Sequence, residues 1–233
     1  MNIQTQPSSK QALLSPRYLE GVQTALRAHA TQTRKSNTYG KIPYLSHVLA
    51  VSSLVMEFGG DEDQAIAGLL HDTIEDGGSS YEAEIRKTFG TEVCRLVLAC
   101  TDGTLDEKKQ WNQASLEDKQ QAWKTRKTKY LNHLEHVDDR ALLVIGSDKF
   151  HNTQTLVRDL HHEGLKTFKR FVGRQEGTLW YYESIGQVFR QRPQVAISTC
   201  LIREIDTFNQ LAQSLTSTAR SEHSASPLIL KTR

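Results

Sequence analysis

The chain has 233 residues, of which 37% are hydrophobic and 24% are charged, the composition of an ordinary globular protein. Its formal net charge of +2 lacks the basic excess of a duplex-binding surface, so we expect no nucleic-acid partner. No stretch approaches the ~20 apolar residues that cross a membrane, so we also expect no membrane partner.

Helical periodicity recurs along most of the chain and predicts an all-α fold. Apolar side chains at helical spacing predict a helix over 44–58, which Gly59 and Gly60 end. Asp61, with Gln64 three residues later, predicts a capping box and a second helix that runs to Asp72. The same periodicity predicts further helices over 18–32, 80–88, 90–101, 117–133, 139–160, 163–173, 175–191 and 194–213.

The remaining segments define the domain boundaries. Residues 101–115 are polar and predict a loop, whereas 1–15 and 214–233 are rich in small polar residues and predict segments of low order. We find no internal repeat and no linker between these ends. The sequence therefore predicts one domain over 16–213, a single bundle of roughly ten helices.

The cysteines and the N-terminal residues indicate in which cellular compartment the protein is expected. Cys94, Cys100 and Cys200 are odd in number and lack CxxC spacing, which argues against a disulfide framework and against a structural zinc site. The N-terminal residues lack the long apolar segment of a signal peptide. We therefore expect a cytoplasmic protein.

Four polar residues stand where these helices should be apolar, or next to such positions. His47 lies on the apolar stripe of its helix, the pair His71-Asp72 closes an apolar helix, and Asp148 lies within another. A single histidine there is more often a hydrogen-bonded core residue, and a single aspartate a salt-bridge partner or helix cap. One metal ion is the simpler account of all four, because a buried carboxylate is costly without a partner. Imidazole and carboxylate ligands together favour Mn²⁺, Fe²⁺ or Zn²⁺.

Two acids follow the His-Asp pair by four residues each. Glu75 and Asp76 would lie one turn beyond the pair if the helix continued, and so close to the metal. Negative charge at the C-terminus of a helix is mildly unfavourable, which hints that function keeps the acids there. The small residues Ala67 and Gly68, one turn earlier, would leave room for a ligand. Since a divalent ion lowers the pKa of water, the set indicates metal-assisted phosphoester hydrolysis.

The ordered set His47, His71-Asp72 and Asp148 resembles the H…HD…D signature of the HD-domain phosphohydrolases. The longer segments RAHATQTRKSNT, IPYLSHVLAV, GLLHDTIEDGG and SDKFHNTQTL resemble the hydrolase domain of the RelA/SpoT-homologue family. The chain length is similar to that of the stand-alone small alarmone hydrolases, which lack a synthetase domain. This resemblance spans about residues 18–192.

The resemblance implies a single HD-type hydrolase domain whose metal, one Mn²⁺ ion, is held by the two histidines and two aspartates. It implies hydrolysis of the 3′-pyrophosphate of the alarmone (p)ppGpp to GDP or GTP and pyrophosphate. Glu75 and Asp76 match the family's acidic pair, thought to orient or activate the attacking water. The small-molecule partner would be the alarmone nucleotide, and the oligomeric state stays open.

The resemblance also assigns contacts with the nucleotide. The matching positions are Arg34, Lys35, Asn152 and, in the same loop as the first two, Ser36. Independently, a substrate with two pyrophosphates needs cations, which the cluster Lys124, Arg126 and Lys127 can supply. A solvated helix face is the alternative for each of these cations.

Several other functions share these residues. A hydrolase of (p)ppApp or a phosphatase of the NADPH 2′-phosphate would use the same metal ligands. A nucleotide 5′-phosphatase or cyclic-nucleotide phosphodiesterase is disfavoured by the Arg34-Lys35-Ser36 loop and by the acidic pair. A non-catalytic alarmone sensor would not need Glu75 and Asp76.

Overall fold

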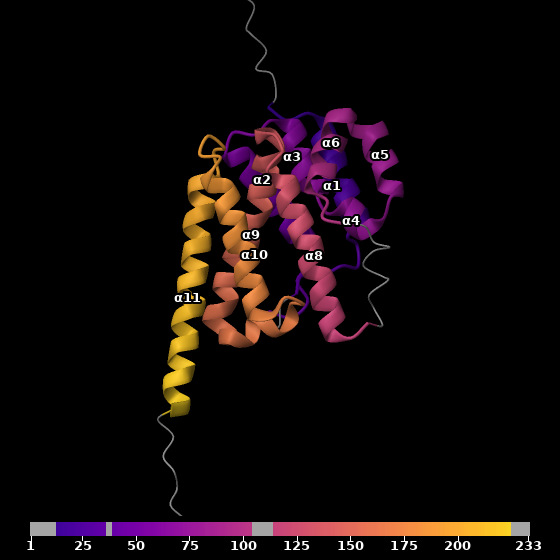
Figure 1. Ribbon diagram of the computed structural model, residues 1–233. Coiled ribbons are helices and arrows are strands. Elements are labelled where there is room, and N and C mark those ends of the chain that lie inside the picture. Colours follow the sequence, from indigo (N-terminus) through magenta and orange to yellow (C-terminus); the bar gives the residue numbers. More distant parts are fainter. Residues whose placement is uncertain (1–12, 36–38, 104–113, 225–233) are drawn as a thin grey trace, which may run out of the picture.

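The computed structural model describes residues 13–35, 39–103 and 114–224, and it confirms the predicted all-α fold (Figure 1). Among these residues the β structure amounts to one isolated bridge, between Thr33 and Pro43. The helices are α1 (Pro16–Ala28), α2 (Leu45–Glu57), α3 (Glu62–Leu70), α4 (Thr73–Gly77), α5 (Ser80–Phe89), α6 (Thr91–Cys100), α8 (Leu116–Leu134), α9 (Asp139–Glu163), the 3₁₀ helix η1 (Gly164–Arg170), α10 (Arg174–Arg190) and α11 (Ser198–Ser224).

Side-chain caps set where several helices begin. Ser15 caps α1 through its hydroxyl, and Asp138 accepts the backbone N–H of Ala141 at the start of α9. The predicted capping box of α3 is confirmed, because Asp61 and Gln64 each accept the other's backbone N–H. These caps satisfy N–H groups that lack partners within the helix.

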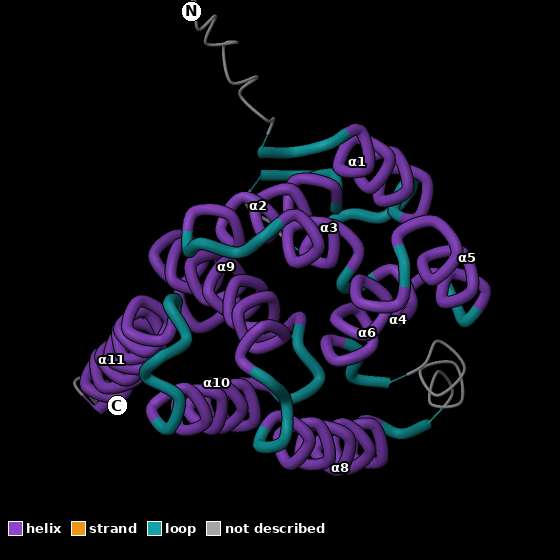
Figure 2. The backbone as a smooth tube through the Cα atoms, turned by 90° about the horizontal axis from the view of Figure 1, so that it is seen from above, coloured by secondary structure: helices purple, strands orange, loops and turns teal. Residues whose placement is uncertain are grey.

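Helix α9 is the centre of the bundle and packs against α2, α3, α6 and α11. Figure 2 shows it between the α2–α3 pair and the α10–α11 pair. Its first half is buried on all sides, from Ala141 through Asp148, as expected of a helix in the middle of a core. A carboxylate at Asp148 therefore lies deep inside the protein.

Two predicted helices differ in the structure. The helix predicted to reach Asp72 ends at Leu70. The chain turns at 71–72, where Asp72 has φ −98° and ψ −2°, and the short α4 begins at the next residue. The helix predicted over 163–173 is a 3₁₀ helix instead. Gly164 ends α9 with φ +58°, a conformation that glycine adopts without steric cost.

The C-terminal helix is longer than predicted. Residues 214–224 were expected to have low order, but α11 continues through them to Ser224 and in Figure 1 runs past the neighbouring helices. Leu215 still packs against the core, and hydroxyl groups such as that of Thr216 bond to the carbonyl four residues earlier. Residues 225–233 and 1–12 lie outside the described part of the chain. No helix in that part has the length and apolar character needed to cross a membrane.

Candidate metal centre

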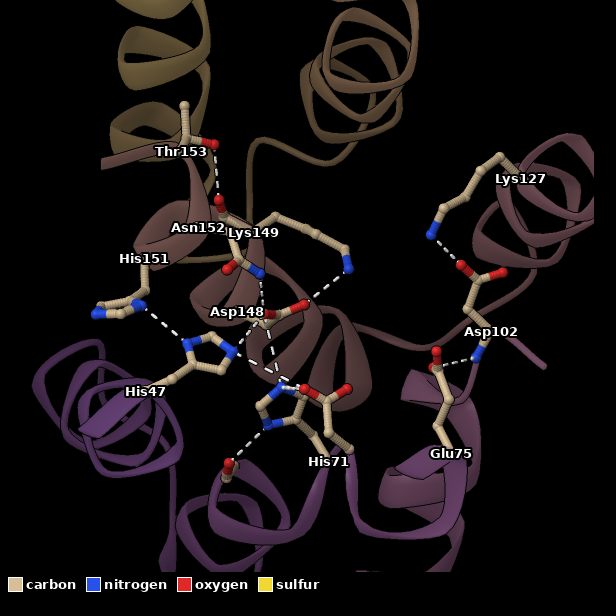
Figure 3. A network of polar contacts seen from close by, with 12 residues as sticks. His47, His71, Glu75, Asp102, Lys127, Asp148, Lys149, His151, Asn152 and Thr153 are labelled. Carbon is tan, nitrogen blue, oxygen red and sulfur yellow. Dashed lines mark hydrogen bonds and ion pairs between the residues drawn. The ribbon is translucent and has the colours of Figure 1, made fainter. Parts of the chain in front are cut away.

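The structure brings the four predicted metal ligands together from α2, the α3–α4 turn and α9. Figure 3 shows three of them, His47, His71 and Asp148. Nitrogen and oxygen atoms of His47, His71 and Asp148 lie within 4.8 Å of one another, and all three residues are buried. The Oδ1 atom of Asp148 is 3.1 Å from His47 Nε2 and 3.6 Å from His71 Nε2. Asp72 joins the group, with its Oδ2 atom 3.0 Å from His71 Nε2 and 3.9 Å from His47 Nε2.

The unmet hydrogen-bonding capacity of this cluster fits a metal ion. The Nε2 atoms of His47 and His71 are both buried, and each lies 3.0 to 3.1 Å from a carboxylate oxygen without the geometry of a hydrogen bond. A buried polar atom without a partner is costly, and a cation between the two imidazoles would satisfy both. Two imidazole nitrogens with two carboxylates make a donor set suited to a divalent transition metal.

The opposite nitrogen of each imidazole is held in place. His71 Nδ1 lies 2.9 Å from the carbonyl oxygen of Gly68, so it must donate, and in the neutral imidazole Nε2 then carries the lone pair. His47 Nδ1 lies 2.8 Å from Nδ1 of His151, so one of these nitrogens accepts from the other. If His151 accepts, the lone pair of His47 Nε2 also faces the site. Partners of this kind orient metal-binding histidines.

Gly68 has a different role from the one expected. A Cβ atom at this position would lie 3.1 Å from the Cα atom of Ser52, so the glycine allows α3 to approach the α2 backbone. The prediction that it leaves room for a ligand is therefore wrong. Its actual effect is to bring α2, which carries His47, close to the end of α3.

The electrostatics of the cluster favour ionised carboxylates. Burial lowers the pKa of His47 to about 3 and so keeps this imidazole neutral. Burial alone would raise the pKa of Asp148, but the Lys149 ammonium and both histidines hold it well below its usual range. Burial would lower the pKa of His71, whereas Asp72 and Asp148 raise it above its ordinary value. The site thus attracts positive charge, as a proton on His71 or as a metal ion.

Lys149 is a site residue that the sequence analysis missed. Its ammonium lies 2.7 Å from Asp148 Oδ2, its side chain is 13% exposed, and the rings of Tyr130 and Tyr181 lie within 6 Å. Asn152 donates to the other carboxylate oxygen, Oδ1, at 2.5 Å. Lys149 thereby occupies the oxygen of Asp148 that does not face the histidines. Lys149 could not be predicted from the sequence, because a lysine next to an aspartate does not by itself indicate that either side chain is buried.

The predicted acidic pair lies on α4, beyond the turn, and each acid has its own partner. Glu75 accepts the backbone N–H of Asp102 at 3.2 Å and lies on the Asp102 side of the cluster in Figure 3. Asp76 Oδ2 accepts from the side-chain amide of Gln32 at 2.7 Å. Both acids are half-buried. Helix α3 does not continue through them, and they lie instead on the short α4, which begins directly after Asp72.

Two of the predicted nucleotide contacts meet next to the metal cluster. Arg34 donates through Nη2 to Asn152 Oδ1 at 2.7 Å, and Asn152 in turn holds Asp148. Lys35 is exposed and lines a pocket. Ser36 lies outside the described residues.

The other predicted contacts are engaged elsewhere. Arg126 and Lys127 both pair with the buried carboxylate of Asp102, and Arg126 also donates to its carbonyl oxygen. The ammonium of Lys124 lies 2.8 Å above the centre of the Trp180 ring. The sequence does not identify Asp102 as the partner of Arg126 and Lys127, because it lies 24 residues before the first of them.

A pocket of about 1060 Å³ adjoins this region between α6, α8 and the residues after α6. Its wall includes Asp102, which contacts Glu75, and Tyr130, which lies beside Lys149. The pocket is also lined by the cations Lys35, Lys119, Arg126 and Lys129 and by the aromatic ring of Trp123. Cations and an aromatic wall suit a nucleotide with several phosphates.

Comparison with known proteins identifies similar chains. The chain is 34% identical over 142 residues to the guanosine-3′,5′-bis(diphosphate) 3′-pyrophosphohydrolase MESH1 of Xenopus tropicalis, a match covering 60% of this chain and 69% of that protein. The MESH1 of Drosophila melanogaster is 35% identical over 106 residues, which are 45% of this chain and 58% of the fly protein. Part of each relative therefore lies outside the match.

A solved structure shares the fold. It is that of a metazoan orthologue of SpoT described as hydrolysing ppGpp, with a TM-score of 0.58 and 20% identity, covering 91% of this chain and 98% of that one. At this identity the likeness speaks for the fold alone. A model of the HD domain matches residues 22–179, well over half of the chain. With its buried His-His-Asp cluster in the matched region, the chain belongs to the HD domain family.

Proposed function

We propose that this protein hydrolyses the 3′-pyrophosphate of (p)ppGpp to GDP or GTP and pyrophosphate. The observation that carries the proposal is the convergence of two buried imidazole nitrogens on an ionised aspartate, with an acidic pair on the next short helix. The two MESH1 relatives are named for this reaction.

The metal would be one Mn²⁺ ion held by His47, His71, Asp72 and Asp148, whose donor atoms fit it. A divalent ion bound there lowers the pKa of a water molecule and neutralises charge that develops on phosphate oxygens. The buried, neutral imidazole of His47 and the ionised Asp148 are already in the protonation states that metal binding requires.

The protein's own side chains supply the proton transfers and the grip on the nucleotide. Glu75 and Asp76 would orient the attacking water and accept its proton, and both are held by neighbours. Arg34, fixed by Asn152, would contact the nucleotide, as would Lys35 in the adjoining pocket. Lys119 and Lys129 in the same pocket would pair with phosphates. We place this activity in the cytoplasm, with the alarmone nucleotide as the small-molecule partner.

The test is pyrophosphate release from ppGpp, with Mn²⁺ or with EDTA, by the wild type and by His71→Ala. His161→Ala is the matched control, since His161 is exposed on the same helix as Asp148. We expect Mn²⁺-dependent turnover that the first variant loses and the second keeps. Release from ppApp, or phosphate release from NADPH, in place of turnover of ppGpp would redirect the proposal to that nucleotide.

A second comparison separates catalysis from sensing. The double variant Glu75→Gln, Asp76→Asn keeps the size of both side chains and removes their charges. A hydrolase should lose turnover and still bind ppGpp. A protein that binds ppGpp equally well in both forms, with no turnover in the wild type, would be a sensor.

A further inference from the structure

The carboxylate of Asp76 is held by a two-residue chain that reaches into the core. Gln32 donates from Nε2 to Asp76 Oδ2 at 2.7 Å, and its Oε1 atom lies 2.7 Å from Nδ1 of His29. His29 is 3% exposed and follows directly after α1. The acid on the short α4 is thus linked through one half-buried side chain to a buried imidazole.

The chemistry of the three groups fixes the direction of every hydrogen bond. An ionised carboxylate can only accept, so the amide nitrogen of Gln32 must face Asp76 and its oxygen must face His29. His29 Nδ1 must then donate. The chain runs from His29 through Gln32 to Asp76, and each donor has one acceptor.

The backbone of Gln32 makes two further hydrogen bonds. Its N–H donates to the carbonyl of His29 at 3.1 Å, and its own carbonyl accepts from the N–H of Tyr44 at 3.0 Å. The ring of Tyr44 packs against that of His29, with centroids 4.9 Å apart. The hydroxyl of Tyr44 donates to Asp72 Oδ2 at 2.5 Å, and burial, together with Asp72, raises its pKa so that it stays protonated.

Gln32 and Tyr44 therefore contact Asp76 on α4 and Asp72 in the turn before it. Tyr44 holds the predicted metal ligand Asp72, and Gln32 holds Asp76, whose N–H donates to the carbonyl of Asp72 at 2.9 Å. Helix α4 has only five residues, too few to be stable without tertiary support. The direction of the Asp76 carboxylate consequently depends on a partner outside its own helix.

From this arrangement we propose that Gln32, oriented by His29, is a positioning residue that aims the Asp76 carboxylate at the attacking water. The inference rests on the proposed function, because it assigns Asp76 a part in that reaction. Gln32 contacts neither the metal ligands nor the nucleotide in this scheme. Its loss should therefore lower kcat and leave both metal affinity and KM unchanged.

The experiment compares Gln32→Met and Gln32→Glu with the wild type. Both keep the length of the side chain and remove the N–H donor, and Glu adds a carboxylate facing Asp76. The matched control is Gln23→Met, since Gln23 is exposed on α1. For both Gln32 variants we expect kcat for pyrophosphate release from ppGpp to fall about 10- to 100-fold, the cost of misplacing a reacting group by about 1 Å. KM and Mn²⁺ affinity should stay within about threefold of the wild type.

Two variants of His29 test whether its hydrogen bond to Gln32 is needed for turnover. His29→Asn places an amide nitrogen near the position of Nδ1 and should retain most of the turnover that His29→Leu loses. A space-filling role for Gln32 predicts the opposite pattern, with the Met and Glu variants as active as the wild type, and that result would overturn the proposal. Equal losses of kcat and of Mn²⁺ affinity would also overturn it.

Amide hydrogen exchange of residues 73–77 separates this inference from the proposed function. It is measured without substrate, on the wild type, on Gln32→Met and on Gln23→Met. We expect faster exchange of α4 only in Gln32→Met. A wild type without turnover of ppGpp would contradict the proposed function, and unchanged exchange in Gln32→Met would then contradict the positioning role as well.

Discussion

Replacing His151 by alanine should weaken metal binding without touching a ligand. His151 Nδ1 lies 2.8 Å from His47 Nδ1, and the two rings are 4.9 Å apart at an angle of 36°. Burial, followed by the charge of Arg34, lowers the pKa of His151 to about 4, so the ring is neutral and can accept a hydrogen bond. Without it, the imidazole of His47 loses the contact that directs Nε2 toward the site.

The size of the effect follows from the role of such partners. Loss of a group that orients a metal-binding histidine typically costs 10- to 100-fold in metal affinity, which corresponds to about 1.4–2.8 kcal/mol. His151 is half-buried, so the free energy of unfolding of the metal-free protein should change by only about 1 kcal/mol. Calorimetric titration of metal-free protein with Mn²⁺ measures the first quantity, and urea unfolding in EDTA measures the second.

His151→Gln and His161→Ala make this prediction specific. The glutamine can offer a carbonyl oxygen to His47 and should recover part of the affinity, whereas His161 is exposed and should be replaceable without effect. A Mn²⁺ affinity of His151→Ala within about threefold of the wild type would refute the reasoning. It would mean that α2 and the core fix the His47 ring unaided.

Three further predictions concern stability, each measured by urea or thermal unfolding. Saturating Mn²⁺ at 100 times its Kd should stabilise the protein by about 2.7 kcal/mol, and EDTA should reverse this; no shift would argue against a metal site. Asp159→Asn should cost about 3 kcal/mol, because it breaks a buried ion pair with Arg170, and should leave Mn²⁺ affinity unchanged. Gly146→Ala should cost about 1–3 kcal/mol, because its Cβ atom would lie 2.6 Å from Ile197 Cγ2 and 2.9 Å from Phe189 Cε1; equal stability would show that these side chains move aside.

The fold could be predicted from the sequence where local signals were strong. The capping box at Asp61 and the apolar periodicity of α2 and α9 are encoded by residues close together in the chain. The end of α3 at Leu70 could not be predicted, since no glycine or proline stands there and the turn follows from the contacts of His71 and Asp72. The extension of α11 depends on tertiary packing of residues such as Leu215.

In the candidate site, too, local sequence patterns could be predicted and tertiary contacts could not. The convergence of His47, His71 and Asp148 could be predicted because polar residues on buried helix faces are rare and need a partner. The roles of Lys149, Gln32 and Asp102 could not, because each depends on a contact made by the fold rather than on spacing. The same contacts show why a cluster of cations in the sequence is ambiguous, since Lys127 pairs with Asp102 in the structure.

The candidate site combines a metal cluster in the core with groups outside that cluster, and this arrangement bears on which nucleotide is the substrate. The candidate metal ligands lie on core helices or at their ends, and they contact one another and their supporting residues. Such a cluster can serve any phosphoester of suitable geometry, so it does not choose between guanine, adenine or dinucleotide substrates. The choice must be made by groups that reach the rest of the nucleotide. Under the proposed function these would be Arg34 and Lys35 on the segment after α1, together with the pocket wall on α8. Exchanges there should change relative kcat/KM among nucleotides while Mn²⁺ affinity stays constant, and a change in both together would show that the two parts are coupled.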